Sequence, residues 1–160
     1  MAECSCRVVE NGAIKEVPIL PELYHLVGLP QEKAFHEFDG WYHTLAVVSE
    51  TEPDLTLRWG ALLHDVAKGM PTIRQVINGR YTDRGHDNLG AEMAYDLLIR
   101  LGYNKKFASR VSWIVKNHMR FHFFVQNEEA DEKKWMRKEI RSGEIRDSQS
   151  MREAWLQLAK

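Results

Sequence analysis

Four of the seven histidines in this 160-residue chain lie in segments rich in apolar residues, and two of these four are followed directly by an aspartate. The two doublets are His64-Asp65 and His86-Asp87, and the other two histidines are His43 and His118. Adjacent side chains on a helix project about 100° apart. A doublet can therefore offer a neutral imidazole nitrogen and an anionic oxygen to one cation. A third ligand from another helix, such as His43, would hold that ion between helices.

The mixture of donor atoms predicts which metals such a site would take. Nitrogen and oxygen ligands together suit Mn, Fe, Co, Ni, Zn or Mg, and they argue against a structural zinc site built on thiolates. With one coordination position left open, a divalent ion would lower the pKa of a bound water and make hydroxide available near neutral pH. We therefore expect a site that activates water.

Asp65 has the surroundings that favour a metal most. It lies in the largely apolar run 61–68, where burying a carboxylate is costly unless a positive charge compensates. A bound metal would compensate, and so would an ion pair with Lys68 or with Arg58. The surroundings favour the metal, and the ion pair is the alternative that the residues leave open.

Apolar residues at helical spacing predict the elements that carry these side chains. One helix starts near Trp41, and a second, capped by Asp54, runs on to Val66. Two more helices are expected over about 86–102 and 107–118. Together these four helices would place all four histidines in one apolar bundle.

The remaining segments are expected to add one hairpin and shorter helices. An Asn-Gly pair between β-prone residues predicts a β-hairpin over 76–81, which holds the only strands that we expect. Short helices are expected at 21–27, 135–140 and 151–158, and a charged linker at 127–134. We expect residues 1–18 to be loosely structured and residues 19–160 to form a single all-α domain, a helical bundle with one short β-hairpin insert.

Composition excludes several classes of protein. A hydrophobic content of 44% is enough for a sizeable core and excludes a disordered chain. With 22 Lys and Arg against 23 Asp and Glu, the net charge is −1, which disfavours duplex nucleic acid or a membrane as the main partner. The two cysteines, Cys4 and Cys6, form no disulfide framework. Because the sequence also shows no membrane span or signal peptide, a cytoplasmic protein is expected.

The order of these motifs resembles the HD-domain superfamily of metal-dependent phosphohydrolases. The resemblance starts from His43 and the run Leu-Leu-His64-Asp65-x-x-Lys68-Gly69. Four blocks make the chain similar to the HD domain of bacterial tRNA nucleotidyltransferases, at residues 41–45, 57–65, 85–92 and 115–119. The similarity spans roughly residues 20 to 125, in order and with family-like gaps.

The resemblance implies three overlapping sets of functional residues. The metal ligands that it implies are His43, His64, Asp65, His86, His118 and, from a late helix, Asp147. The groups that it implies for a phosphate substrate are Lys68, Arg84, His86 and His118. The residues that it places in catalysis are His64, Asp65 and Lys68. The spacing of Asp147 matches the family pattern only loosely.

The activity implied by the resemblance is that of a metal-dependent phosphohydrolase. Its substrates would be phosphomonoesters or phosphodiesters such as nucleotides, 2′,3′-cyclic phosphates or RNA 3′ ends. Nucleotide addition needs a Gly-Ser turn and an Asp-x-Asp pair for two Mg ions, and this sequence contains neither. A nucleotidyltransferase domain would therefore have to come from another part of the native polypeptide.

Three alternatives stand beside this interpretation. The chain could be a non-catalytic HD fold that docks RNA or protein, or a fragment of a tRNA nucleotidyltransferase. It could also be another enzyme of the same fold, such as a dinucleoside tetraphosphate or deoxynucleotide hydrolase. Metal affinity separates the docking domain from the enzymes, and substrate profiling separates the enzymes from one another.

Overall fold

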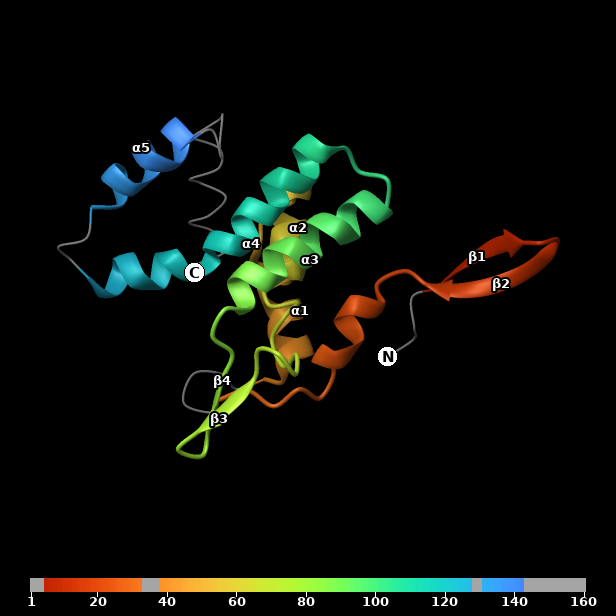
Figure 1. Cartoon of the computed structure of the whole chain (residues 1–160), viewed down its shortest axis with the longest axis horizontal. Coiled ribbons are helices and arrows are strands. Elements are labelled where there is room, and N and C mark those ends of the chain that lie inside the picture. Colours follow the sequence, from red (N-terminus) through yellow and green to blue (C-terminus); the bar gives the residue numbers. More distant parts are fainter. Residues whose placement is uncertain (1–4, 33–37, 128–130, 143–160) are drawn as a thin grey trace.

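Four helices form the body of the molecule (Figure 1). The computed structural model describes residues 5–32, 38–127 and 131–142. Within this part of the chain the body consists of α1 (Gly40–Glu50), α2 (Leu55–Leu63), α3 (His86–Arg100) and α4 (Lys105–Gln126), preceded by the 3-10 helix η1 (Pro21–Leu26). The predicted all-α bundle is therefore confirmed, and its helices begin close to their predicted positions.

The hydrophobic core lies where α2, α3 and α4 meet. Leu63, Val66, Leu98, Val111 and Val115 are completely enclosed there. Helices α3 and α4 lie side by side and are joined by the short turn 101–104 (Figure 1). Burial of these side chains is the main stabilising contribution to the bundle, and it fixes the relative positions of the helices that carry the histidines.

Side-chain caps determine where three of the helices begin. Asp39, Asp54 and Asn104 each accept a hydrogen bond from the backbone N–H three residues further on. Such caps satisfy one of the free N–H groups of a first helical turn. The predicted cap at Asp54 is confirmed. Because each cap fixes the first turn, it also fixes the face on which later residues of that helix lie.

Two β-hairpins extend from the body, where a single one was predicted (Figure 1). The predicted hairpin is confirmed as β3 (Gln75–Ile77) and β4 (Arg80–Thr82), with positive φ angles at Asn78 and Gly79. The expectation of a loosely structured N-terminus is wrong for the described residues, because β1 (Ser5–Glu10) and β2 (Ala13–Pro18) pair antiparallel. Asn11-Gly12 has the same left-handed conformation as the predicted turn and sets this register. Almost every residue of both strands is exposed. Neither strand therefore has the alternation of buried and exposed residues by which a strand is predicted from sequence.

The C-terminal helices differ from the prediction in their bounds. Helix α4 continues to Gln126, eight residues beyond the predicted end at His118, because no glycine or proline interrupts that stretch. Helix α5 (Glu132–Ser142) begins inside the segment predicted as a linker. Its Trp135 stacks on Trp113 of α4 with 6.0 Å between ring centroids, which ties α5 to the bundle. The predicted helix at 151–158 lies outside the described residues.

No helix in the described ranges combines the length and the apolar character that crossing a membrane requires.

Candidate metal centre

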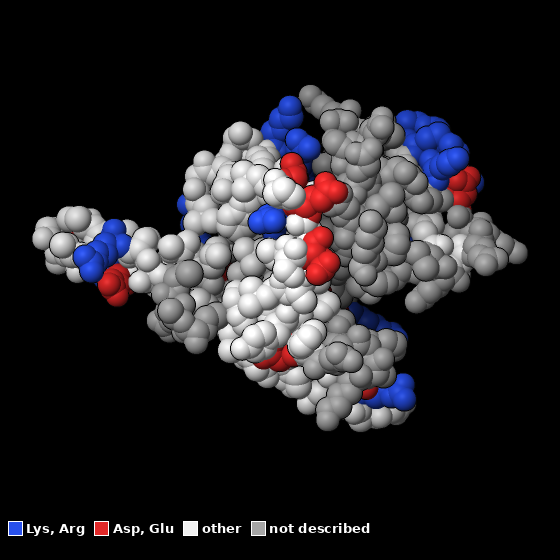
Figure 2. All heavy atoms as spheres, turned by 180° about the vertical axis from the view of Figure 1, so that it is seen from behind, with Lys and Arg blue, Asp and Glu red and all other residues white. Residues whose placement is uncertain are grey.

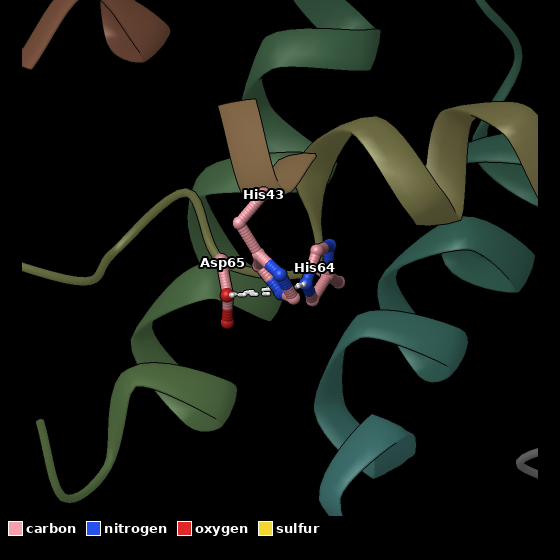
Figure 3. Close-up of side chains that lie close together, drawn as sticks. All are labelled: His43, His64 and Asp65. Carbon is pink, nitrogen blue, oxygen red and sulfur yellow. Dashed lines mark hydrogen bonds and ion pairs between the residues drawn. The ribbon is translucent and has the colours of Figure 1, made fainter. Parts of the chain in front are cut away.

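Five polar side chains that are far apart in the sequence meet at one end of the core. His43 comes from α1, His64 caps the C-terminal end of α2, and Asp65 follows in the next turn. His86 is the first residue of α3, and His118 lies in the middle of α4. All except His43 are buried. Figure 3 shows His43 and His64 pointing toward the carboxylate of Asp65.

One oxygen of the Asp65 carboxylate faces three nitrogen atoms. Oδ2 lies 2.7 Å from Nζ of Lys68, 3.1 Å from Nε2 of His64 and 3.5 Å from Nε2 of His43. The two imidazole nitrogens are themselves 3.3 Å apart. The Asp65–Lys68 ion pair that the sequence left open is therefore present. The alternative partner Arg58 instead contacts the carbonyls of Thr51 and Glu52.

The other oxygen of Asp65 faces the histidines of α3 and α4. Oδ1 lies 3.3 Å from Nε2 of His86 and 3.7 Å from Nε2 of His118. These two nitrogens are 3.1 Å apart. Asp65 thus belongs to two triads, one with His43 and His64 and one with His86 and His118, in each of which all ligand atoms lie within 4.8 Å of one another.

Backbone carbonyls orient three of the four imidazoles. Nδ1 of His64 lies 2.7 Å from the carbonyl oxygen of Ala61, and Nδ1 of His118 lies 2.6 Å from that of Val115. Nδ1 of His86 lies 2.7 Å from the carbonyl oxygen of Asp83. A carbonyl oxygen only accepts, so each Nδ1 carries the proton and donates it. In the neutral rings each Nε2 then presents its lone pair to the cluster, as in metal-ligating histidines.

Electrostatics set the charge of the Asp65 carboxylate and of the His118 imidazole. Burial by itself raises the pKa of Asp65, but the positive charges of His64, when protonated, and of Lys68 outweigh it and hold that pKa well below its usual value. Burial, together with the charge of His64, lowers the pKa of His118 to about 3. Near neutral pH the cluster therefore contains an ionised carboxylate and at least one neutral imidazole.

The residues present fit a divalent metal. Both carboxylate oxygens of Asp65 are buried and have no hydrogen bond of regular geometry among the described residues. The Nε2 atoms of His86 and His118, which both present lone pairs because their Nδ1 atoms carry the protons, face one another at 3.1 Å, and this arrangement is repulsive. A cation bound among these atoms removes both costs, because it gives every lone pair a partner.

The remaining predicted site residues have different positions. The ammonium of Lys68 touches Asp65 and also donates to Oε1 of Gln31 at 3.3 Å. Arg84 is exposed and has no ion pair among the described residues. Asp147 lies outside the described residues. His25, which the sequence did not favour as a ligand, contacts the carbonyl of Lys68 through Nε2 at 3.0 Å, so its role is structural.

Asp83 supports the site and was missed by the sequence reasoning. Its Oδ1 accepts hydrogen bonds from the Gly69 N–H at 2.9 Å and from Nε of Arg74 at 3.0 Å, and its Oδ2 accepts from Nη2 of Arg74 at 2.7 Å. Burial raises the pKa of Asp83, but the hydrogen bonds from Arg74 and Gly69 outweigh it and lower that pKa. Its backbone carbonyl holds His86. No local sequence motif predicts the contacts of its side chain with Gly69 and Arg74, since these residues come close to Asp83 only in the folded chain.

Comparison with known proteins gives one family and several relatives. The model of the HD domain family matches residues 40–143. The chain is 37% identical over 105 residues to an A-adding tRNA nucleotidyltransferase of Deinococcus radiodurans, which is 62% of this chain and 24% of that protein. It is 38% identical over 105 residues to a CC-adding tRNA nucleotidyltransferase of Thermus thermophilus, with the same coverage of 62% and 24%.

A third relative is a multifunctional CCA protein of Cupriavidus necator, 30% identical over 117 residues, which is 71% of this chain and 27% of that protein. The chain thus spans about a quarter of the length of the curated relatives that it matches. No solved structure gives a significant match. The matched region contains all five side chains of the cluster.

Proposed function

The chain belongs to the HD domain family, and from that membership we propose that it is a metal-dependent phosphohydrolase. The observation that carries the proposal is the convergence of four imidazole Nε2 atoms on the buried carboxylate of Asp65. A site for a divalent metal with a lysine beside it is suited to a phosphate ester, whose negative charge needs positive groups around it.

The proposed ligands are His43, His64, Asp65, His86 and His118. When bound there, a divalent ion such as Mg, Mn, Fe, Co, Ni or Zn would supply Lewis acidity and lower the pKa of a coordinated water. The backbone carbonyls that hold three of the imidazoles keep the ligand atoms in place, so little reorganisation is needed on binding.

Lys68 is the proposed contact for the phosphate. Its Nζ lies 2.7 Å from Oδ2 of Asp65, and its side chain is 13% exposed. A bound phosphate oxygen could take the place of Gln31, which accepts from Lys68 at the long distance of 3.3 Å. His43, the one histidine of the cluster that is not buried, marks the side from which a substrate can approach.

The proposed substrates are nucleotides, 2′,3′-cyclic phosphates or RNA ends. This choice is supported by the relatives, whose names assign them nucleotide addition to tRNA. Nucleotide addition itself is not proposed for this chain, because it has no Gly-Ser turn and no Asp-x-Asp pair. A nucleotidyltransferase domain in the native polypeptide is the proposed source of that activity.

The test compares metal content and hydrolysis in the purified chain and in a variant carrying both His64→Ala and Asp65→Ala. Bound metal is measured by elemental analysis, and hydrolysis with p-nitrophenyl phosphate and bis(p-nitrophenyl) phosphate in added Mn, Ni, Co, Mg, Fe or Zn. Arg100→Gln is the control, because Arg100 pairs with Glu22 away from the cluster. We expect the control to keep both properties and the double variant to lose both.

The preferred ester then identifies a monoesterase or a diesterase. A natural chain that binds no metal and is inactive with every ion would refute the proposal and leave a docking domain as the better account. Circular dichroism of the double variant separates the loss of ligands from the loss of folding.

A further inference from the structure

Helix α5 has all of its Lys and Arg side chains on one side. At 100° per residue they fall within an arc of about 140°, and no acidic residue of the helix lies inside that arc. We call this side the basic face, and its residues, all exposed, are Lys133, Lys134, Arg137, Lys138 and Arg141. At 1.5 Å per residue they extend along about 12 Å of helix. Helix α5 therefore presents a concentrated strip of positive charge.

The opposite side of α5 is packed against α4. Trp135 stacks on Trp113 with 6.0 Å between ring centroids, and Nε1 of Trp113 donates to Oε2 of Glu139 at 3.1 Å. Met136 is only 4% exposed. A helix that lies in a membrane surface keeps its apolar side free for lipid. The apolar side of α5 is already occupied, so a membrane is not the partner that the basic face fits.

The cations of the basic face repel one another. Each has another cation three or four residues away, and like charges at this spacing destabilise a helix. Arg137 lies 3.8 Å from Asp131, with both side chains more than half exposed. The other four cations have no ion pair within the described part of the chain. A bound polyanion would remove the repulsion, whereas solvent alone leaves it in place.

The extent of the basic face favours a long anion over a small one. Lys134, Lys138 and Arg141 border one hollow in the surface, but Lys133 and Arg137 lie outside it. A small anion in the hollow would leave these two cations without a partner. A nucleic-acid duplex carries one negative charge per about 1.7 Å of its axis, and so roughly seven over 12 Å.

A duplex fits the basic face better than a single strand does. Proteins that hold single strands offer aromatic rings on which unpaired bases stack. The only aromatic residue of α5 is Trp135, and its ring is already in contact with Trp113 and with the guanidinium of Arg120, which lies 5.9 Å from the ring centroid. The basic face thus supplies cations for phosphates and no free ring for a base.

We propose that the basic face of α5 binds the phosphate backbone of a double-stranded nucleic acid without reading its sequence. In Figure 2, which is turned by 180° from Figure 1, blue atoms gather over α5 at the upper right. The net charge of −1 does not oppose this, because charges more than about 10 Å away are largely screened at 0.1 M salt. The proposal goes beyond the phosphohydrolase function and does not depend on a metal.

The test measures binding of labelled RNA and DNA duplexes of about 20 base pairs by fluorescence anisotropy in EDTA. Lys138→Gln is expected to reduce the slope of log K against log salt by about 0.9, the value for one phosphate contact. A triple variant with Lys134→Gln, Lys138→Gln and Arg141→Gln should reduce it by about 2.7 and weaken binding at least about tenfold at 0.1 M salt. Two duplexes of unrelated sequence should bind equally.

The matched control is a triple variant with Arg80→Gln, Lys105→Gln and Lys106→Gln. These exposed cations lie on β4 and at the start of α4, and their removal changes the net charge equally. We expect the control to bind duplexes as the natural chain does. Gln has a helix propensity close to that of Lys and Arg, and the α5 variants lose repulsion. Their melting temperature should therefore be no lower than that of the natural chain.

The outcomes separate this proposal from the phosphohydrolase function. If the α5 variants lose duplex binding while no ester is hydrolysed with any metal, the basic face keeps its assignment and the phosphohydrolase proposal fails. If esters are hydrolysed but the α5 triple variant binds duplexes as tightly as the natural chain, the assignment of the basic face is refuted. Tighter binding of a single strand than of the duplex, or no duplex binding by the natural chain, overturns it as well.

Discussion

Replacing Asp83 by alanine tests whether contacts at the base of the β3–β4 hairpin hold His86 in the cluster. Asp83 and Arg74 form a partly buried ion pair, with side chains 9% and 12% exposed and two hydrogen bonds of 3.0 and 2.7 Å between them. Removing one partner of a fully buried pair costs about 3–5 kcal/mol, because the other charge is left without a partner. Arg74 keeps its bond to the carbonyl of Pro30, so we expect the lower end, about 3 kcal/mol.

The same change should weaken metal binding although Asp83 is not a proposed ligand. Its backbone carbonyl, which receives Nδ1–H of His86, moves when the side chain no longer anchors it to Gly69 and Arg74. Loss of such outer contacts typically weakens metal affinity 10- to 100-fold. Because the carbonyl itself remains, we expect about tenfold, which corresponds to about 1.4 kcal/mol.

Two measurements check these values. Urea unfolding in EDTA gives the change in stability, and competition with a chromophoric chelator gives the change in metal affinity. Asp83→Asn keeps an acceptor for Gly69 and should lie between the natural chain and the alanine variant. Glu22→Ala breaks the more exposed pair with Arg100, and we expect it to cost at most about 1 kcal/mol and to leave metal affinity unchanged.

Asp83→Ala with normal metal affinity would refute the role of the hairpin base in positioning His86. Asp83→Ala with unchanged stability would refute the stabilising value assigned to its pair with Arg74.

Three further predictions concern the rest of the fold. The pKa of His118 is lowered from 6.5 to about 3, so the contribution of the neutral imidazole to stability is complete above pH 6.5 and is lost as the pH falls toward 3. Urea unfolding in EDTA should show the free energy of unfolding falling by up to about 1.4 kcal/mol per pH unit in this window. A free energy of unfolding that stays constant from pH 7 to pH 4 would contradict this prediction. Gly69→Ala should destabilise by at least about 1 kcal/mol, because φ is +78° and an added Cβ would come within 2.4 Å of Leu29; an unchanged melting temperature would count against this. Deletion of residues 1–17 should shift the melting temperature little, because β1 and β2 are almost fully exposed; a large drop would mean that the N-terminal hairpin is part of the cooperative unit.

Local patterns in the sequence predicted most of the fold. The apolar periodicity placed α1 to α4, Asp54 was identified as a cap, and Asn78-Gly79 identified the β3–β4 hairpin. The same dipeptide type at Asn11-Gly12 also forms a hairpin turn, but the strands on either side of it are almost fully exposed and show no alternation of buried and exposed residues that would have predicted them. The end of α4 was also misplaced. The apolar repeat that predicts this helix ends at Val115, just before His118, but nothing there interrupts a helix and α4 runs on to Gln126.

The sequence by itself determined the chemistry of the candidate centre. The types and spacing of His43, His64, Asp65, His86 and His118 fix the available ligand atoms. The apolar surroundings of Asp65 call for a positive charge beside it, which Lys68 or a metal can supply. These are local properties. The residue type determines the donor atoms, and the sequence within a few helical turns determines which face of a helix a residue lies on.

Only the tertiary structure decided how these ligands are held. Packing of α2 and of α3 against α4 brings both oxygens of Asp65 between two pairs of imidazoles. The carbonyl of Asp83 contacts His86 only three residues further on, but the Asp83 side chain ties this turn to Gly69 and Arg74, which lie elsewhere in the chain. Distances between segments far apart in the chain depend on how the core packs, and no short-range pattern encodes them. The hairpin's place beside the centre is a property of the same kind.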